Sequence, residues 1–315
     1  MSRERISQLD FLKCVCIVLM VIFHLVFIGE KFPYAKQIVY TFHMPIFLLI
    51  SGYLVRADRD ALPFFKSQWW LLVPYVALEL PYLVLSGLLG VRGGETDLSP
   101  FHIAYRVVAD PLGPYWYLHT LLICNLSLWT VRHLLYKIGW LYQLGAFGAI
   151  LLLWVYATGW ISDIVFYYFL GVAISLSGTP FLQLFRPSLT SLLLAAAICI
   201  YPNNLHYNTP FGIFLVYLVI KWLLWCYDRI STPLHQLSRF IGQNTLVILL
   251  FSPIFTLLAK PLVPLLAFDP TGMLFLIIAT TIAITGSFAI AWGMDALHIS
   301  PWFCGKPHLL ARPNT

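Results

Sequence analysis

The chain has 315 residues, of which 60% are apolar and only 10% are charged, and its formal net charge is +6. A soluble domain carries roughly 25% charged residues, so this chain has too few to cover a water-facing surface. Its positive charges are spread along the sequence and form no basic tail, which excludes a nucleic-acid-binding arm. We therefore predict an all-α, polytopic membrane protein with a single domain over residues 1–315.

Apolar runs predict the transmembrane segments, because a spanning helix needs about 20 mostly apolar residues. The sequence predicts about ten segments, at approximately 9–29, 37–55, 69–90, 115–136, 140–158, 161–178, 187–201, 210–227, 241–260 and 271–296. With a cytoplasmic N-terminus, about twelve Lys and Arg residues lie on the cytoplasmic side and about five outside, which predicts two cytoplasmic termini. The longest outer segment, from Val91 to Pro114, is rich in Gly and Pro and reads as a loop shaping a substrate mouth.

The first segment, LDFLKCVCIVLMVIFH, carries ionisable side chains at helical spacing. Lys13 and His24 are close to three helical turns apart, so both point the same way, with their Cα atoms about 16 Å apart. Asp10 lies one turn before Lys13 and can pair with it. Ionisable groups inside a bilayer are costly and therefore indicate function. The alternatives are a Lys13 that extends to the membrane surface and a His24 that makes a packing hydrogen bond.

The second segment contains FHMPIFLLISGYL and runs back inward. If it lies antiparallel to the first segment, His43 and His24 are at about the same depth. Pro45 interrupts backbone hydrogen bonding near His43, and the Ser51-Gly52 pair allows close approach of another helix. The alternative interpretation is a kinked helix with a small-residue contact, which accounts for Pro45 and Gly52 but not for His43.

Two further segments carry buried polar candidates. Glu79 lies in the middle of the third segment, and its carboxylate either contacts a histidine or substrate hydroxyl or serves as a structural partner. The fourth segment opens with PYWYLHTL, where Trp116 and Tyr117 are typical of membrane-interface aromatics and His119 lies near the depth of the other two histidines. Three histidines suggest a metal, but spacing such as HExxH is absent, so we rank metal below acid–base chemistry and expect no metal.

The sequence resembles the integral-membrane acyltransferase family 3. The resemblance rests on LDFLK…H and FHMPIFLLISGYL, and on FFKSQWWLLVPY, PYWYLHTL, YYFLGVAIS and IGQNTLVILL, which follow in the expected order. The family's basic-x10-His motif falls on Lys13 and His24, with Lys in place of the usual Arg. Its SGF-like motif falls on Ser51, Gly52 and Tyr53.

The resemblance implies a ten-helix acyltransferase in the bacterial cytoplasmic (inner) membrane. Such an enzyme takes an acyl group, usually acetyl, from cytoplasmic acyl-CoA and transfers it to a sugar hydroxyl on the outer side. The basic cluster that commonly precedes the third span is reduced here to Lys66. We expect Lys13, Ser51, Arg56 and Lys66 to bind the donor, which is acetyl-CoA acting as a co-substrate.

In the resulting hypothesis His24 removes the proton of the acceptor hydroxyl, because the pKa of an unperturbed histidine, about 6.5, is close to working pH. His43 or Glu79 orients His24 or stabilises charge, and Trp116 and His119 contact the acceptor. A covalent route through an acyl-histidine intermediate is the alternative to this direct transfer. The expected partners are acyl-CoA, a carbohydrate acceptor and the lipid bilayer, with no nucleic acid. The rival hypotheses are a transporter or flippase for a glycan-related substrate and a non-catalytic membrane partner.

Overall fold

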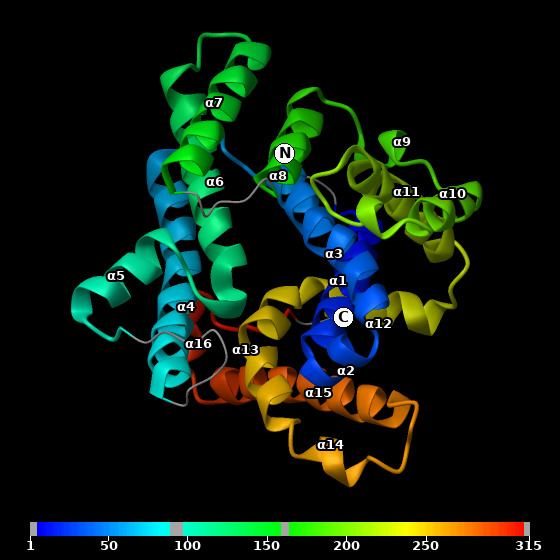
Figure 1. Ribbon diagram of the computed structural model, residues 1–315. Helices are drawn as coiled ribbons and strands as arrows, with labels where there is room; N and C mark the ends of the chain where they lie inside the picture. Colours follow the sequence, from blue (N-terminus) through cyan, green and yellow to red (C-terminus); the bar gives the residue numbers. More distant parts are fainter. Residues whose placement is uncertain (1–4, 89–96, 159–163, 312–315) are drawn as a thin grey trace. The chain divides into compact units, whose positions relative to one another are not determined.

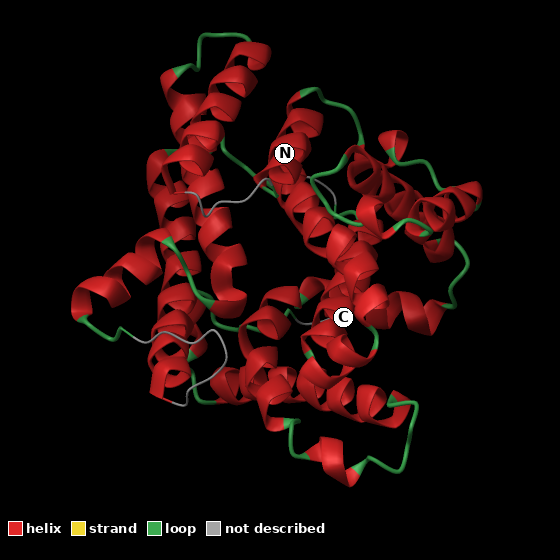
Figure 2. Cartoon of the chain, in the orientation of Figure 1, coloured by secondary structure: helices red, strands yellow, loops and turns green. Residues whose placement is uncertain are grey.

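The computed structural model describes residues 5–88, 97–158 and 164–311, and all regular secondary structure in these ranges is helical (Figure 2). This confirms the predicted all-α class. Residues 91–96 of the predicted outer segment and residues 161–163 of the predicted sixth span lie outside the described ranges. The helices, labelled as in Figure 1, are α1 (Ser7–His24), α2 (Val26–Lys31), α3 (Pro33–Leu54), α4 (Ala61–Leu88), α5 (Pro100–Ala109), η1 (Gly113–Tyr115), α6 (Trp116–Leu134), α7 (Trp140–Thr158), α8 (Val165–Leu176), α9 (Phe181–Leu184), α10 (Thr190–Cys199), η2 (Pro202–Asn204), α11 (Pro210–Tyr227), α12 (Thr232–Gln243), α13 (Thr245–Leu258), α14 (Leu262–Leu265), α15 (Met273–Ala296) and α16 (Ser300–Cys304).

Six of the described helices are long and apolar enough to cross a bilayer, namely α1, α3, α4, α7, α11 and α15. The pair α12 and α13 makes a seventh candidate, bent by 79° at the junction, while α8 and α10 are apolar but shorter. The 19 residues of α6 include His119, Asn125 and Arg132, which lower its mean hydropathy. Each predicted segment overlaps a helix, and the set fits a multi-pass membrane protein. The number of about ten spans stays a prediction.

The outer segment contains α5, so the interpretation of the whole segment as a loop is wrong. Ser99 caps this helix, because its hydroxyl accepts a hydrogen bond from the His102 amide at 3.4 Å. Pro100 occupies the first helical position, where the missing N–H costs nothing. The Ser-Pro pair is therefore a helix start in this segment.

The described chain packs into two compact units, and the border between them falls inside α3, between Ile50 and Ser51. Both units combine segments from distant parts of the sequence. Each unit is described below by itself, and the single domain over residues 1–315 stays a prediction.

Among the described residues, the first unit comprises 5–50, 179–297 and 308–311 and is built around α1, which packs on α11, α12, α13 and α15. The side chains of Leu12, Cys16 and Val21 lie in this core. The closest approach is between α1 and α12. A Cβ atom added at Gly242 would lie 1.9 Å from the carbonyl oxygen of Asp10, so only glycine fits there.

Among the described residues, the second unit comprises 51–88, 97–158, 164–178 and 298–307, and in it α6 packs on α4, α7 and α8. Gly52, at the end of α3, lies against the backbone of α8, since a Cβ atom there would lie 2.1 Å from the Tyr168 carbonyl oxygen. The predicted close approach at Ser51-Gly52 is therefore confirmed.

Candidate active site

The helix of the first predicted span ends at His24. Leu25 has an extended backbone (φ −68°, ψ 103°), and the chain resumes as the short helix α2. The predicted span at 9–29 is therefore two helices with a break directly after the histidine. The His24 side chain is exposed, whereas those of Phe23 and Leu25 are buried on either side of it.

A backbone carbonyl fixes the tautomer of His24. Its Nδ1 lies 2.7 Å from the Met20 oxygen, and a carbonyl can only accept, so Nδ1 carries the hydrogen. Nε2 then has a free lone pair and can take a proton. The C-terminal end of a helix also favours positive charge, so it stabilises the imidazolium that a proton transfer would form. The local structure thus suits His24 to act as a base.

His43 is held in the same way. Its Nδ1 donates to the Val39 oxygen at 2.8 Å, and only 3% of the residue is exposed. The ring of Tyr40 contacts both histidines, with centroid distances of 6.1 Å to His24 and 5.1 Å to His43. The structure therefore brings the two imidazoles together around one phenol ring. Tyr40 was missed in the sequence, although it lies one helical turn before His43. The roles of both histidines in the chemistry stay predictions.

A cluster of three charges lies at the N-terminal end of α1, with Arg5 just before the helix and Asp10 and Lys13 on it. Asp10 Oδ1 accepts from Lys13 Nζ at 2.8 Å, and Asp10 Oδ2 accepts from Arg5 Nε at 2.7 Å. The Asp10 carboxylate is 4% exposed, whereas the Lys13 side chain is 20% exposed. The structure thus shows the Asp10–Lys13 pair that the spacing predicts. Because two cations share one carboxylate, the cluster keeps a net positive charge.

Ser51, the first residue of the SGF-like motif, has a partner in the second unit. Its hydroxyl lies 2.8 Å from the hydroxyl of Tyr117, at the start of α6. Tyr117 is buried, so its interpretation as a membrane-interface aromatic is wrong. Ser51 as a donor-binding residue stays a prediction.

Arg56 and Lys66 are exposed and flank the loop between α3 and α4. Neither side chain forms an ion pair within the described ranges, so both charges are available to an anionic ligand. Their assignment to the donor stays a prediction.

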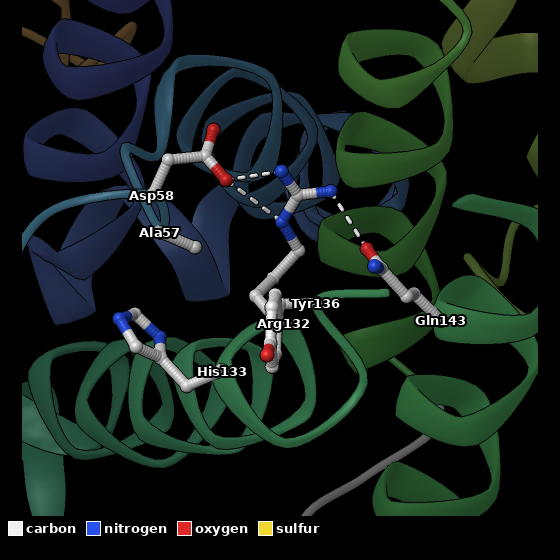
Figure 3. Close-up of a pocket in the computed structure, with 6 residues that line it drawn as sticks. All are labelled: Ala57, Asp58, Arg132, His133, Tyr136 and Gln143. Atoms are coloured by element: carbon white, nitrogen blue, oxygen red, sulfur yellow. Dashed lines mark hydrogen bonds and ion pairs between the residues drawn. The ribbon is translucent and has the colours of Figure 1, made fainter. Parts of the chain in front are cut away.

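A cavity of about 340 Å³ lies in the same unit (Figure 3). Arg132 is fixed at this cavity, because its guanidinium donates to the Asp58 carboxylate and, at 2.7 Å, to Gln143 Oε1. The sequence analysis did not single out Arg132, because its partner Asp58 is 74 positions away in the chain. The cavity is lined by Ala57, Asp58, Arg132, His133, Tyr136 and Gln143.

Glu79 is fully buried in α4, and its Oε1 accepts from the Leu112 amide at 2.6 Å. It therefore holds the chain just before Gly113, a residue with φ +79° that lies against the Tyr82 ring. Glu79 Oε2 has no hydrogen-bond partner among the residues that the structure describes. The catalytic role of Glu79 stays a prediction.

His119 and Trp116 lie on the first turn of α6. His119 is buried, and its Nε2 donates to the Val108 oxygen at the end of α5 at 2.7 Å. Tyr75 donates to the neighbouring Val107 oxygen at 2.6 Å, so two side chains hold α5. Trp116 is half-buried at the start of α6. Acceptor binding by Trp116 and His119 stays a prediction.

Comparison with known proteins identifies the family. The family described as "Acyltransferase domain" matches residues 6–292, a range that includes every candidate site residue named above. Searches of curated proteins and of solved structures gave no significant match. The match extends over far more than half of the 315 residues and confirms the resemblance seen in the sequence. The chain therefore belongs to acyltransferase family 3 and is a membrane acyltransferase.

Proposed function

We propose that this acyltransferase moves an acetyl group from cytoplasmic acetyl-CoA to a hydroxyl of a cell-surface or lipid-linked carbohydrate. In this proposal it lies in the bacterial inner membrane with both termini in the cytoplasm. The observation that carries the proposal is the hydrogen bond from His24 Nδ1 to the Met20 oxygen, because it leaves Nε2 of an exposed imidazole ready to accept a proton. The charge pattern of the loops supports the orientation.

In the proposed reaction His24 Nε2 accepts the proton of the acceptor hydroxyl while the oxygen attacks the thioester carbonyl. The new C–O bond forms and the C–S bond breaks. The CoA thiolate then takes the proton from the imidazolium, which restores the neutral histidine. The carbonyls at the end of α1 favour the cationic ring during this interval.

The Lys13 cluster supports binding of the donor. Ten residues of continuous helix separate Lys13 from His24, which places their Cα atoms about 16 Å apart on one face. Lys13 is the less exposed of the two cations that share Asp10, and the net positive charge of the cluster suits the phosphates of acetyl-CoA. In this proposal the phosphates bind at the inner end of α1 and the thioester reaches toward His24.

The test measures acetyl-CoA consumption and acceptor mass with the purified full-length protein. We expect His24→Ala to reduce transfer by roughly 10²- to 10⁴-fold, which is the usual contribution of a general base. His206→Ala is the matched control, since His206 is exposed in a loop of the same unit and hydrogen bonds to its neighbour Asn208. Near wild-type transfer by a folded His24→Ala protein would refute the proposal, as would transport of unmodified carbohydrate without acetyl-CoA consumption.

A further inference from the structure

A lysine that the proposed reaction does not use lies beside the two histidines. Lys36 is in the first turn of α3, and its Nζ lies 5.2 Å from the centroid of the Tyr40 ring. The same ring lies 6.1 Å from the His24 centroid. The ammonium and the catalytic imidazole are therefore at most about 11 Å apart, with Tyr40 in contact with both.

The chain makes room for this side chain at Gly29 in α2. A Cβ atom added there would lie 3.2 Å from Lys36 Cδ and 3.4 Å from Lys36 Nζ, and also 3.2 Å from the Phe23 oxygen. The ammonium thus lies along the helix break that exposes His24. Gly29 is buried, so the lysine passes over a packed backbone rather than extending freely into solvent.

No carboxylate pairs with Lys36 among the described residues. Lys31, on the preceding helix, differs because its Nζ donates to the Pro270 oxygen at 2.6 Å. The nearby Asp269 already accepts from Thr271 and from the Leu274 amide. Lys36 is half-buried, and the Tyr40 ring under its ammonium offsets part of the hydration that this burial removes. The positive charge of Lys36 is therefore available to pair with an anionic ligand.

We propose that Lys36 binds an anionic group of the carbohydrate acceptor, a carboxylate or a phosphate, while His24 removes the proton from the acceptor hydroxyl. This inference rests on the proposed function and adds the acceptor class, an acidic saccharide. Lys36 takes part in no bond-making step and keeps its proton. Its distance from His24 fixes how far the acidic group lies from the hydroxyl that is acetylated, so the pair selects both the sugar and the position.

The test compares two oligosaccharide acceptors of equal length, one containing a uronic acid and one neutral, with the purified full-length protein and acetyl-CoA. Wild type is expected to show the lower KM for the acidic acceptor. We expect Lys36→Met to raise that KM roughly 10- to 100-fold, the loss of one charge-assisted hydrogen bond. The KM for the neutral acceptor and for acetyl-CoA is expected to stay unchanged, and Lys36→Arg to retain most of the preference.

Lys31→Met is the matched control and is expected to keep the wild-type preference, because Lys31 is bound to Pro270. Gly29→Ala is a second variant that leaves the charge in place but displaces it. It is expected to raise the KM for the acidic acceptor by a smaller factor.

Three results would overturn the inference. The first is an equal KM for the two acceptors in wild type, and the second is an unchanged preference in Lys36→Met. The third is an equal fall of kcat for both acceptors, which would place the charge at the reacting carbonyl. If wild type transfers no acetyl group to either acceptor, the proposed function itself fails. If wild type transfers the acetyl group and Lys36→Met keeps the preference for the acidic acceptor, only the inference about Lys36 fails.

Discussion

The contact between α1 and α12 gives the sharpest prediction about stability. Gly242 lies so close to Asp10 that an added Cβ atom would be 1.9 Å from the Asp10 oxygen and 2.5 Å from its carbonyl carbon. Ordinary contacts between such atoms are about 3.5 Å, so Gly242→Ala forces the two backbones apart by about 1.5 Å. No side chain can rotate away to relieve this contact, because both atoms belong to the backbone of Asp10.

We expect Gly242→Ala to destabilise the protein by about 3 kcal/mol, at the upper end of the usual cost of overpacking. In a domain of this size that corresponds to a lower unfolding temperature by about 5–10 °C. The measurement is thermal unfolding of the detergent-solubilised protein followed by tryptophan fluorescence. Since the displaced residue is the partner of Lys13, we also expect a higher KM for acetyl-CoA.

Gly293→Ala is the control, since Gly293 lies in α15 of the same unit and nothing lies within 4 Å of an added Cβ atom. Alanine favours a helix over glycine by about 1 kcal/mol, so this variant should be slightly more stable than wild type. Equal stability of the two variants would refute the reasoning, because it would mean that α1 and α12 do not touch at Gly242.

Two further predictions concern single hydrogen bonds, and a third concerns the carboxylate of Asp269. Ser51→Ala and Tyr117→Phe should show a coupling of about 1 kcal/mol in a double-mutant cycle of unfolding, and purely additive effects would contradict the 2.8 Å bond. Tyr75→Phe leaves the Val107 oxygen unbonded, so hydrogen exchange in α5 should be faster than in wild type, whereas unchanged exchange would count against the contact. The Thr271 hydroxyl and nearby backbone amides lower the pKa of Asp269 to about 2. Its stabilising effect should be complete above about pH 4 and lost as the pH falls toward 2. The difference in unfolding temperature between wild type and Asp269→Asn should therefore shrink over this window, and a constant difference would refute the assignment.

Local spacing predicted the parts of the site that lie on one helix. Asp10, Lys13 and His24 occur within 18 residues of α1, so helical geometry alone relates their side chains. The motif on α3 likewise pointed to His43 and to a close approach at Gly52, although α8 was not predicted as the helix that fills it. The all-α class followed from composition, because a chain with so few charges has to bury its backbone polar groups in helices or in a closed barrel when it enters a bilayer.

Features that depend on distant parts of the chain were not predictable. The break at Leu25 carries no Gly or Pro, and the apolar run continues through it, so nothing local marks it. Tyr117 bonds to a residue 66 positions away, and its burial is a tertiary effect. The helix α5 is a different case. Ser99 and Pro100 are typical of a helix start, but the nearby glycines favoured the interpretation of the segment as a loop.

Both imidazoles near Tyr40 are oriented by the helix that carries them, four residues back. In the proposed reaction, the stretch Met20–His24 therefore orients the base by itself, and no carboxylate elsewhere is needed to support it. Such a site tolerates extensive change in the surrounding helices, so that acceptor pockets can diversify around an unchanged reactive atom. Its weak point is the main chain, because a proline within that turn would turn the ring away even with the histidine still present.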